Sequence, residues 1–488
     1  MTVEVSVEET QKEEMVVSEK EAKMVDDVAE KVEENPQNSE DEPKPNLVEK
    51  SSSYREESNY LSDLKESERN ALFELKSKLE EAISSNTLFK TEEKKEKEKP
   101  MNEKKEKTEE VDEKEGNPDE KTIEEGEEEG EKESEKKVEK NEEISIWGVP
   151  LMSTESSEGT DVILLKFLRA REFKVNEAFE MLKRTLVWRK NFKIGDILDE
   201  DLEEDLDNAA YMKGIDRENH PVCYNIFGVF GNEELYQKVF GSEEKREQFL
   251  RWRFQFMEKG IKKLSFQPGG VSSILQVYDL KNCPGPSKKE IRNATYKAIG
   301  LLQDNYPELV VKNVFINVPF WYYAFYSLIS PFLTQRSKSK FVVARPAKVT
   351  ETLLKYIHLE EIPTQYGGFK RENEIVFNSE NGGVSEICLK PGSTETIEIQ
   401  APDAGATLIW DLTVVGWEVS YKEEFIPTDD GSYTIIIQKE KKMDSIEEPV
   451  RNTFRNNEPG NVVLTIKSNS KKKKRAFYRY HIQQGCSV

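Results

Sequence analysis

A stretch of 23 residues without a charge, residues 313–335 (NVFINVPFWYYAFYSLISPFLTQ), constrains this chain more than any other feature. In a chain with 34% charged residues, such a stretch must be buried in protein, embedded in a bilayer, or able to visit both. About 20 apolar residues suffice to span a membrane. However, Asn317, Pro319 and Pro331 interrupt the stretch, and its tyrosines lie in the middle instead of at the interfaces. We therefore predict a buried strand up to Val318 and then an apolar helix, not a transmembrane helix.

The net charge of −23 is confined to the front of the chain. Residues 1–146 contain 48 acidic and 25 basic residues, whereas the remaining 342 residues contain 47 of each. The front segment is rich in Glu, Lys and Ser and has too few apolar residues to form a core, so we predict a disordered acidic arm. Two interpretations stay open, a solubilising tail and a regulated arm that repels or engages membranes and partners.

One part of this arm has a helical pattern. Leu72, Leu75, Leu79 and Ile83 fall on one face of a helix, with charged residues between them. Isolated helices of this length are marginal in water. We therefore expect a short helix that forms only against a partner.

The rest of the chain divides into three parts. Residues 147–205 show the spacing of two helices, divided near residues 173–175, and form a small all-α subdomain. Residues 206–370 alternate strands with helices, which predicts an α/β domain with parallel pairing. Residues 371–488 contain short β-type runs separated by turn residues, which predicts an antiparallel β-sandwich. The predicted fold class is thus multidomain.

Seven motifs in register resemble the CRAL-TRIO lipid-transfer fold: FLRAREFKV, YDLK, QDNYPE, FINVP, SPFL, SKSKF and PTQYGG. The match covers residues 160–369. The β-rich tail resembles a GOLD domain, and the order of acidic arm, CRAL-TRIO and GOLD resembles the plant patellins. The resemblance implies an α/β pocket that holds the acyl chains of a lipid, closed by a mobile gate helix at about residues 323–333. The gate residues would be Tyr323, Phe325, Tyr326, Leu328, Ile329, Phe332 and Leu333.

The resemblance also implies a head-group site. In phosphatidylinositol-binding relatives, residues of the LRAR, YPE and post-gate motifs contact the inositol phosphate, and the matching positions here are Arg171, Glu308, Ser337 and Lys340. Arg and Lys donate to phosphate, Glu accepts from inositol hydroxyls, and Ser does either. Arg171 and Glu308 could instead pair with each other or cap helices, and Lys340 could be a solvated turn lysine.

Two departures from the family pattern bear on the choice of lipid. Glu172 stands where relatives often have a second basic residue, which removes a phosphate partner. Ile274 and Gln276 stand where relatives have hydroxyl groups for phosphocholine. These residues favour an inositol lipid over dual exchange with phosphatidylcholine.

A second basic feature lies in the β-rich tail. Five consecutive cations follow the segment SNS and are expected in a hairpin loop: Lys471, Lys472, Lys473, Lys474 and Arg475. Near an anionic leaflet each is worth about 1 kcal/mol of salt-sensitive attraction. We prefer a membrane-surface interpretation over a solvated loop or a nuclear-localisation signal.

The sequence contains no signature of an enzyme. There is no GxSxG motif or P-loop, and the three histidines are not spaced as a metal pair, so we expect no catalytic residue, metal or cofactor. The start MTVEVSVEET lacks the features of a secretory signal, and the four cysteines are far apart, which indicates reduced thiols in the cytoplasm.

We predict a non-enzymatic, peripheral-membrane protein that binds a phosphoinositide or related phospholipid on anionic membranes. The resemblance implies a role in membrane trafficking, including cell-plate formation in cytokinesis, at the cell plate and plasma membrane. Two alternatives stay open: an adaptor that recruits proteins through the GOLD domain and acidic arm, and a carrier of a small apolar ligand. We expect no nucleic-acid partner.

Overall fold

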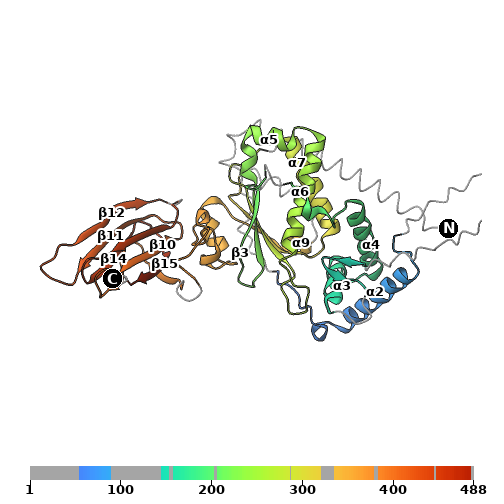
Figure 1. Cartoon of the computed structure of the whole chain (residues 1–488), viewed down its shortest axis with the longest axis horizontal. Coiled ribbons are helices and arrows are strands. Elements are labelled where there is room, and N and C mark those ends of the chain that lie inside the picture. The colour runs from blue at the N-terminus through green and yellow to red at the C-terminus, as the bar shows by residue number, and fades with distance from the viewer. Residues whose placement is uncertain are drawn as a thin grey trace, which may run out of the picture.

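The computed structural model describes residues 54–89, 144–152, 158–202, 206–285, 287–319, 335–378, 383–444 and 447–484. These residues form a helical subdomain, an α/β domain and a β-sandwich, which follow one another along the long axis of the molecule (Figure 1). The order of the three folded parts is the one that the sequence predicts.

The helical subdomain contains α2 (Glu66–Ser84), α3 (Glu158–Ala170) and α4 (Val175–Asn191), with a short hairpin of β1 (Ser145–Ile146) and β2 (Val149–Pro150). The chain leaves α3 through Glu172 and Phe173, whose φ angles of 52° and 61° are left-handed. This conformation ends the helix, and it confirms the predicted division near residues 173–175.

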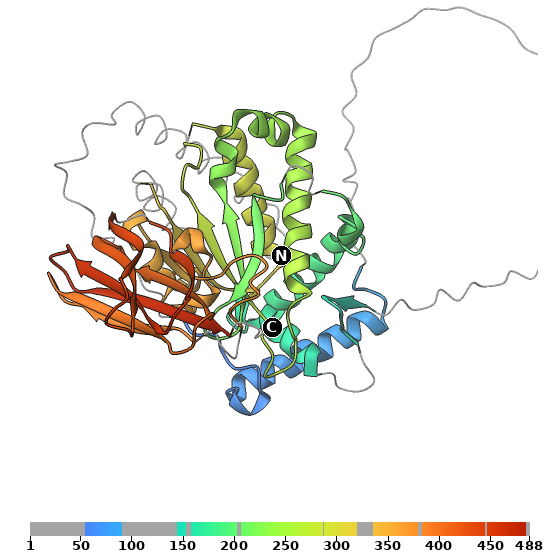
Figure 2. The same cartoon turned by 60° about the vertical axis from the view of Figure 1, so that its left-hand side comes forward.

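The α2 helix lies within the stretch predicted as a disordered arm, and there the prediction is wrong. Leu72, Leu75 and Leu79 are 4%, 0% and 1% exposed, in the same core cluster as α3 and α4. Figure 2 shows α2 alongside both helices. The partner that the predicted helix required is therefore the chain's own helical subdomain, and residues 54–89 belong to the folded body.

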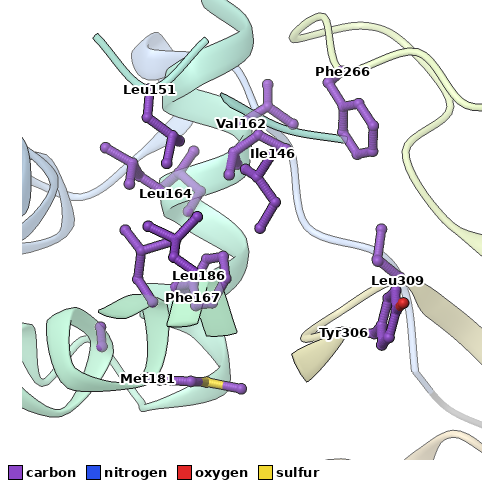
Figure 3. Packing of buried hydrophobic residues seen from close by; sticks show 14 of the residues in the cluster. Ile146, Leu151, Val162, Leu164, Phe167, Met181, Leu186, Phe266, Tyr306 and Leu309 are labelled. Carbon is purple, nitrogen blue, oxygen red and sulfur yellow. The ribbon is translucent and has the colours of Figure 1, made fainter. Parts of the chain in front are cut away.

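This core extends from the helices into the α/β domain. Phe167 of α3 and Tyr306, which ends α7, both stack on Trp147 with ring centroids 6.2 Å away. Figure 3 shows the side chains of the helical subdomain in the same packed region as Phe266, Tyr306 and Leu309. Because helices and sheet share one core, the position of α3 relative to the sheet is determined by packing.

The α/β domain is built on a five-stranded sheet with the order β3-β4-β5-β6-β7. Strands β4 to β7 are parallel, as the sequence predicts, and β3 is an antiparallel edge strand. The strands are β3 (Ala210–Ile215), β4 (Pro221–Ile226), β5 (Ile274–Asp279), β6 (Val310–Ile316) and β7 (Phe341–Val343).

Helices cover both faces of this sheet. Cys223 and Ile274 share a core with α6 (Glu243–Ile261), which packs on α5 (Glu233–Phe240) and α7 (Lys289–Asn305). On the opposite face, Val222 and Leu275 pack with α10 (Val349–Leu353). Burial on both faces explains why these strands have nearly continuous apolar sequences.

The β-sandwich consists of two four-stranded antiparallel sheets, β13-β10-β15-β8 and β12-β11-β14-β9. Its strands are β8 (Ser385–Leu389), β9 (Thr394–Ala401), β10 (Thr407–Val414), β11 (Val419–Pro427), β12 (Ile435–Met443), β13 (Val450–Arg455), β14 (Gly460–Ser468) and β15 (Lys474–Gln483). Because β14 and β15 lie in different sheets, residues 469–473 cross between sheets, and the predicted hairpin is wrong.

A buried ion cluster fastens the sandwich to the segment that precedes it. Asp411 of β10 is fully buried and accepts Arg451 of β13 at 2.8 Å and Arg479 of β15 at 2.7 Å. Arg371, from the segment between the domains, lies 3.0 Å from the same carboxylate. The guanidinium of Arg479 also lies 4.1 Å from the ring centroid of Phe377. The connecting segment is therefore held in place by charge and stacking.

The packing of α2 can be tested by substitution. We expect Leu75→Ala to lower the free energy of unfolding by about 2–5 kcal/mol, because it opens a cavity at a fully buried position. Phe73→Ala, on the same helix but 72% exposed, should change it by less than about 0.5 kcal/mol. Denaturant unfolding of the full chain measures both, and two equally small effects would contradict the placement of α2.

Candidate functional site

Two of the residues predicted from the sequence meet at the amino ends of neighbouring strands. Glu308 lies just before β6 and Lys340 just before β7, and parallel pairing places both at the same edge of the sheet. Lys340 Nζ lies 2.7 Å from Glu308 Oε2, and the two side chains are 10% and 12% exposed. The contact is therefore a largely desolvated ion pair.

Arg336 completes the surroundings of the Glu308 carboxylate. It lies on α9 (Gln335–Ser339), and its Nε and Nη2 donate to the two oxygens of Glu308 at 2.8 and 3.0 Å. Burial alone would raise the pKa of Glu308, but Arg336 and Lys340 together lower it to about 2. Glu308 is thus ionised at neutral pH and holds both cations at the strand edge.

Lys166 of α3 contacts the backbone of the same residue. Its Nζ donates to the carbonyl oxygen of Glu308 at 2.9 Å, and the residue is only 2% exposed. Burial lowers the pKa of Lys166 to about 8, against the attraction of Glu56 and Glu308. Glu308 itself has a φ of 54°, a left-handed conformation that costs of order 1–3 kcal/mol for a residue other than glycine. The contacts to its carbonyl and carboxylate hold this conformation.

The other two predicted residues are placed differently. Ser337 lies on α9, and its carbonyl accepts from the backbone N–H of Lys340 at 3.2 Å. Arg171 donates to the carbonyl of Ala170 at 3.3 Å and forms no ion pair with Glu308 or another described residue. The head-group role of Arg171 stays a prediction.

Two basic residues of α3 that we did not select, Lys166 and Arg169, are buried in this region. They are three residues apart on one helical face. A lysine within the apolar run ILLKFL is the sequence signal that could have revealed them.

An extended segment before α2, residues 54–59, crosses this cluster, and we call it the strap. The Glu57 carboxylate accepts from Nη1 and Nη2 of Arg336 at 2.8 and 2.6 Å, and it lies 3.5 Å from Arg169 Nε. The Tyr54 ring centroid lies 4.7 Å from Lys340 Nζ and 5.4 Å from the Arg336 guanidinium carbon. A carboxylate and a ring of the strap thus cover the cations that surround Glu308.

Other strap residues contact the turns that precede β4 and β5. Glu56 Oε2 lies 2.9 Å from His220 Nε2, and Nδ1 of His220 lies 2.9 Å from Asp216 Oδ2. Asn59 Nδ2 lies 3.5 Å from the hydroxyl of Ser272. The strap therefore follows the amino ends of the parallel strands. No feature of the sequence identifies it, because Glu56 and Glu57 have the composition of the surrounding arm.

The sheet carries three neighbouring aromatic side chains, two of which lie toward the carboxyl ends of β5 and β6. The rings of Tyr278 and Phe315 stack with centroids 4.9 Å apart, and Phe315 meets Phe341 edge-on at 5.4 Å. All three residues are half-buried. The predicted gate, residues 323–333, lies outside the described residues. Within the described ranges, no helix is both long and apolar enough to span a bilayer.

A cavity of about 490 Å³ lies at the opposite, carboxyl ends of the parallel strands, between the sheet and the β-sandwich. It is lined by residues such as Asp279, Asn317 and Trp417. None of the predicted head-group residues lines it. The cavity is therefore separate from the Glu308 cluster, which we define as Glu308 with the cations Lys166, Arg169, Arg336 and Lys340.

The basic run of the β-sandwich is only partly available for binding. Lys471, Lys472 and Lys473 are exposed in the segment that crosses between the sheets. Lys474 instead lies 2.8 Å from Glu418, and Arg475 forms two contacts with Glu386 at 2.6 and 2.8 Å. Lys474 and Arg475 are thus each paired with a carboxylate, and the membrane-surface role of the five cations stays a prediction.

Comparison with known proteins matches each of these parts. The family described as "CRAL/TRIO, N-terminal domain" matches residues 71–184, "CRAL/TRIO domain" matches residues 207–368, and "Patellin-1-like, C-terminal GOLD domain" matches residues 390–474. Patellin-4 of Arabidopsis thaliana is 53% identical, and the alignment covers 98% of both chains. The chain belongs to the patellin family.

Further relatives match all of the folded part of this patellin or its CRAL-TRIO part alone. Patellin-3 of Arabidopsis thaliana is 46% identical over 88% of this chain and 78% of its own. A phosphatidylinositol transfer protein, SFH5 of Kluyveromyces lactis, is 29% identical over 50% of this chain and 80% of its own. The crystal structure of Sfh5 covers 45% of this chain and 85% of its own, at 25% identity and a TM-score of 0.37. By its family matches, this patellin has a CRAL-TRIO domain with its N-terminal subdomain and a C-terminal GOLD domain.

The contact between His220 and the strap predicts a pH dependence. Burial alone would lower the pKa of His220, but Asp216 and Glu56 raise it from 6.5 to about 9. A raised pKa adds stability that is fully present below pH 6.5 and is lost as the pH rises through 9. At about 1.4 kcal/mol per pKa unit, the contribution is about 3 kcal/mol.

We expect His220→Gln to be less stable than the wild-type chain at pH 6 and the difference to shrink by pH 9.5. Lys166 also titrates in this range, but it does so in both proteins, so the difference isolates His220. Denaturant unfolding as a function of pH measures it. A difference in stability that is constant from pH 6 to 9.5 would show that folding does not raise the pKa of His220.

Proposed function

We propose that this patellin is a peripheral-membrane protein that binds a phosphoinositide, with the head group at the Glu308 cluster. The observation that carries the proposal is the convergence of four cations, Lys166, Arg169, Arg336 and Lys340, at one edge of the sheet. Phosphate binds such donors through charge-assisted hydrogen bonds, and Glu308 can accept from inositol hydroxyls. The Kluyveromyces lactis relative, a phosphatidylinositol transfer protein, supports the same lipid class.

The acyl chains would lie along the aromatic face of the sheet, next to Tyr278, Phe315 and Phe341. Burying apolar surface contributes roughly 25 cal/mol per Å². The predicted gate helix, residues 323–333, would cover the chains. In this proposal the protein binds and carries or presents a lipid, without a catalytic step.

The GOLD domain would add a second contact with the membrane surface. Lys471, Lys472 and Lys473 are exposed, and near an anionic leaflet each cation contributes about 1 kcal/mol. Membership of the patellin family supports a cytoplasmic protein of plant membrane trafficking, including the cell plate in cytokinesis.

The head-group site can be tested with two lysines of one segment. We expect Lys340→Ala to weaken binding to vesicles of phosphatidylcholine with phosphatidylinositol 4-phosphate by about tenfold or more, since a hydrogen bond to a charged group contributes about 1.5–3 kcal/mol. Lys338→Ala removes the same charge two residues away, from a side chain without an ion pair among the described residues. It should bind like the wild-type chain.

Co-sedimentation at physiological salt measures both variants, with vesicles of phosphatidylcholine alone as the reference. Thermal unfolding of each variant separates a loss of binding from a loss of the fold. Equal losses in the two variants, or no preference of the wild-type chain for the phosphoinositide, would refute the head-group assignment.

The contribution of the GOLD domain to membrane binding can be tested separately, through its dependence on salt. Replacing Lys471, Lys472 and Lys473 by alanine should weaken binding to phosphatidylserine vesicles at low salt, and the loss should largely disappear at high salt because surface charges are screened. Co-sedimentation at several salt concentrations measures the effect. An unchanged affinity at low salt would show that this loop does not contribute to membrane binding.

A further inference from the structure

The strap occupies the groups that a phosphate would need. Arg336 lies between two carboxylates, Glu308 on its Nε side and Glu57 on its Nη side. Arg169 donates to the side-chain oxygen of Asn59 at 2.6 Å and to the carbonyl of Ser58 at 2.5 Å. A head group can use the donors of either arginine only after the strap has released them.

Tyr54 shields the remaining cation. Lys340 is 8% exposed, with the Tyr54 ring on one side and Glu308 on the other. The Tyr54 hydroxyl also lies 3.3 Å from Arg336 Nη2 and 3.5 Å from Glu308 Oε2. Access of a phosphate to Lys340 therefore requires displacement of the ring as well as of the strap carboxylate.

The charges of the cluster indicate which ligand can replace the strap. With the strap in place, the four cations face the three carboxylates of Glu56, Glu57 and Glu308, which leaves a net charge of one positive, and the neighbouring pair of His220 and Asp216 does not change this sum. Without Glu56 and Glu57 the net charge is three positive. A phosphodiester supplies one negative charge, whereas each phosphomonoester adds about 1.5 to 2 more at neutral pH. Only a head group with a phosphomonoester restores the charge balance that the strap provides.

The strap can be released without unfolding the helical subdomain. It has no regular secondary structure, whereas α2 begins at Glu66 and is anchored by Leu72, Leu75 and Leu79. The ion pair of Glu57, which is 45% exposed, holds its middle, while Asn59 and the partner of Glu56, His220, are buried. Exposed ion pairs are weak and competed by other ions.

We propose that the strap is a built-in competitor of the lipid head group, so that a head group with a phosphomonoester displaces it and a simple phosphodiester does not. This inference rests on the proposed function, because it concerns the same site. It makes Glu56 and Glu57 specificity-determining residues, which act by excluding weakly charged lipids and not by contacting the lipid.

The experiment uses the full chain and the double variant Glu56→Gln, Glu57→Gln. The wild-type chain should bind vesicles with phosphatidylinositol 4-phosphate much more tightly than vesicles with phosphatidylinositol. In the double variant the affinity for phosphatidylinositol should rise by about tenfold, which corresponds to the 1.4 kcal/mol of a weak charged contact. The preference between the two lipids should therefore shrink.

A matched control removes the same two charges from α2. Glu80 and Glu81 are exposed and form no ion pair with a described residue, so Glu80→Gln, Glu81→Gln reproduces the change in net charge. If both double variants bind phosphatidylinositol equally, the strap does not compete and the inference fails while the proposed function stands. If the wild-type chain binds neither inositol lipid better than phosphatidylcholine, the proposed function itself fails.

A direct measurement follows the strap in the unmodified protein. Hydrogen exchange of residues 54–59 should become faster on addition of inositol 1,4,5-trisphosphate, while α2 keeps its protection. Unchanged or slower exchange in the strap, with the ligand bound, would overturn displacement.

Discussion

The buried carboxylate of Glu308 is the contact on which the edge of the α/β domain depends. An ionised group at 12% exposure is tolerated only when cations and donors surround it, and these come from α9 and from the residue before β7. The backbone of Glu308 is in a left-handed conformation, and Lys166 of α3 holds its carbonyl. One side chain and its backbone thus connect the helical subdomain, two strands and α9, and the strap joins them through Arg336.

Much of the architecture could be predicted from the sequence because it depends on patterns within single elements. Apolar strands that alternate with amphipathic helices lead to a parallel sheet, and short alternating runs between turns lead to a sandwich. The contact between Glu308 and Lys340 can be explained in the same way, since each residue precedes one of two adjacent parallel strands. The strand half of the uncharged stretch is confirmed in β6, which ends at Ile316.

The errors arise where distant segments decide the outcome. α2 and the strap have the composition of the acidic arm, and their burial depends on partners far along the chain, such as Arg336, which is 279 residues from Glu57. Composition reports what a segment can do alone, so it gives no sign of the strap, and for α2 only the spacing of the leucines predicted a helix that needs a partner. In α3 every residue from Gly159 to Arg169 is buried, so the helical pattern does not show which basic residue faces the sheet. The crossing of residues 469–473 between sheets is equally a property of the assembled sandwich.

The short connection between the strap and α2 has a consequence for the strength of lipid binding. Six residues separate Asn59 from Glu66, and α2 is fixed in the core, so the strap stays near the site after release. A competitor on a short tether acts at an effective concentration of about the millimolar range. The apparent dissociation constant of the lipid then equals its intrinsic value divided by the fraction of molecules with the strap released. A change in the strap alone, without a change in the pocket, would therefore shift the lipid concentration at which this patellin is half-saturated.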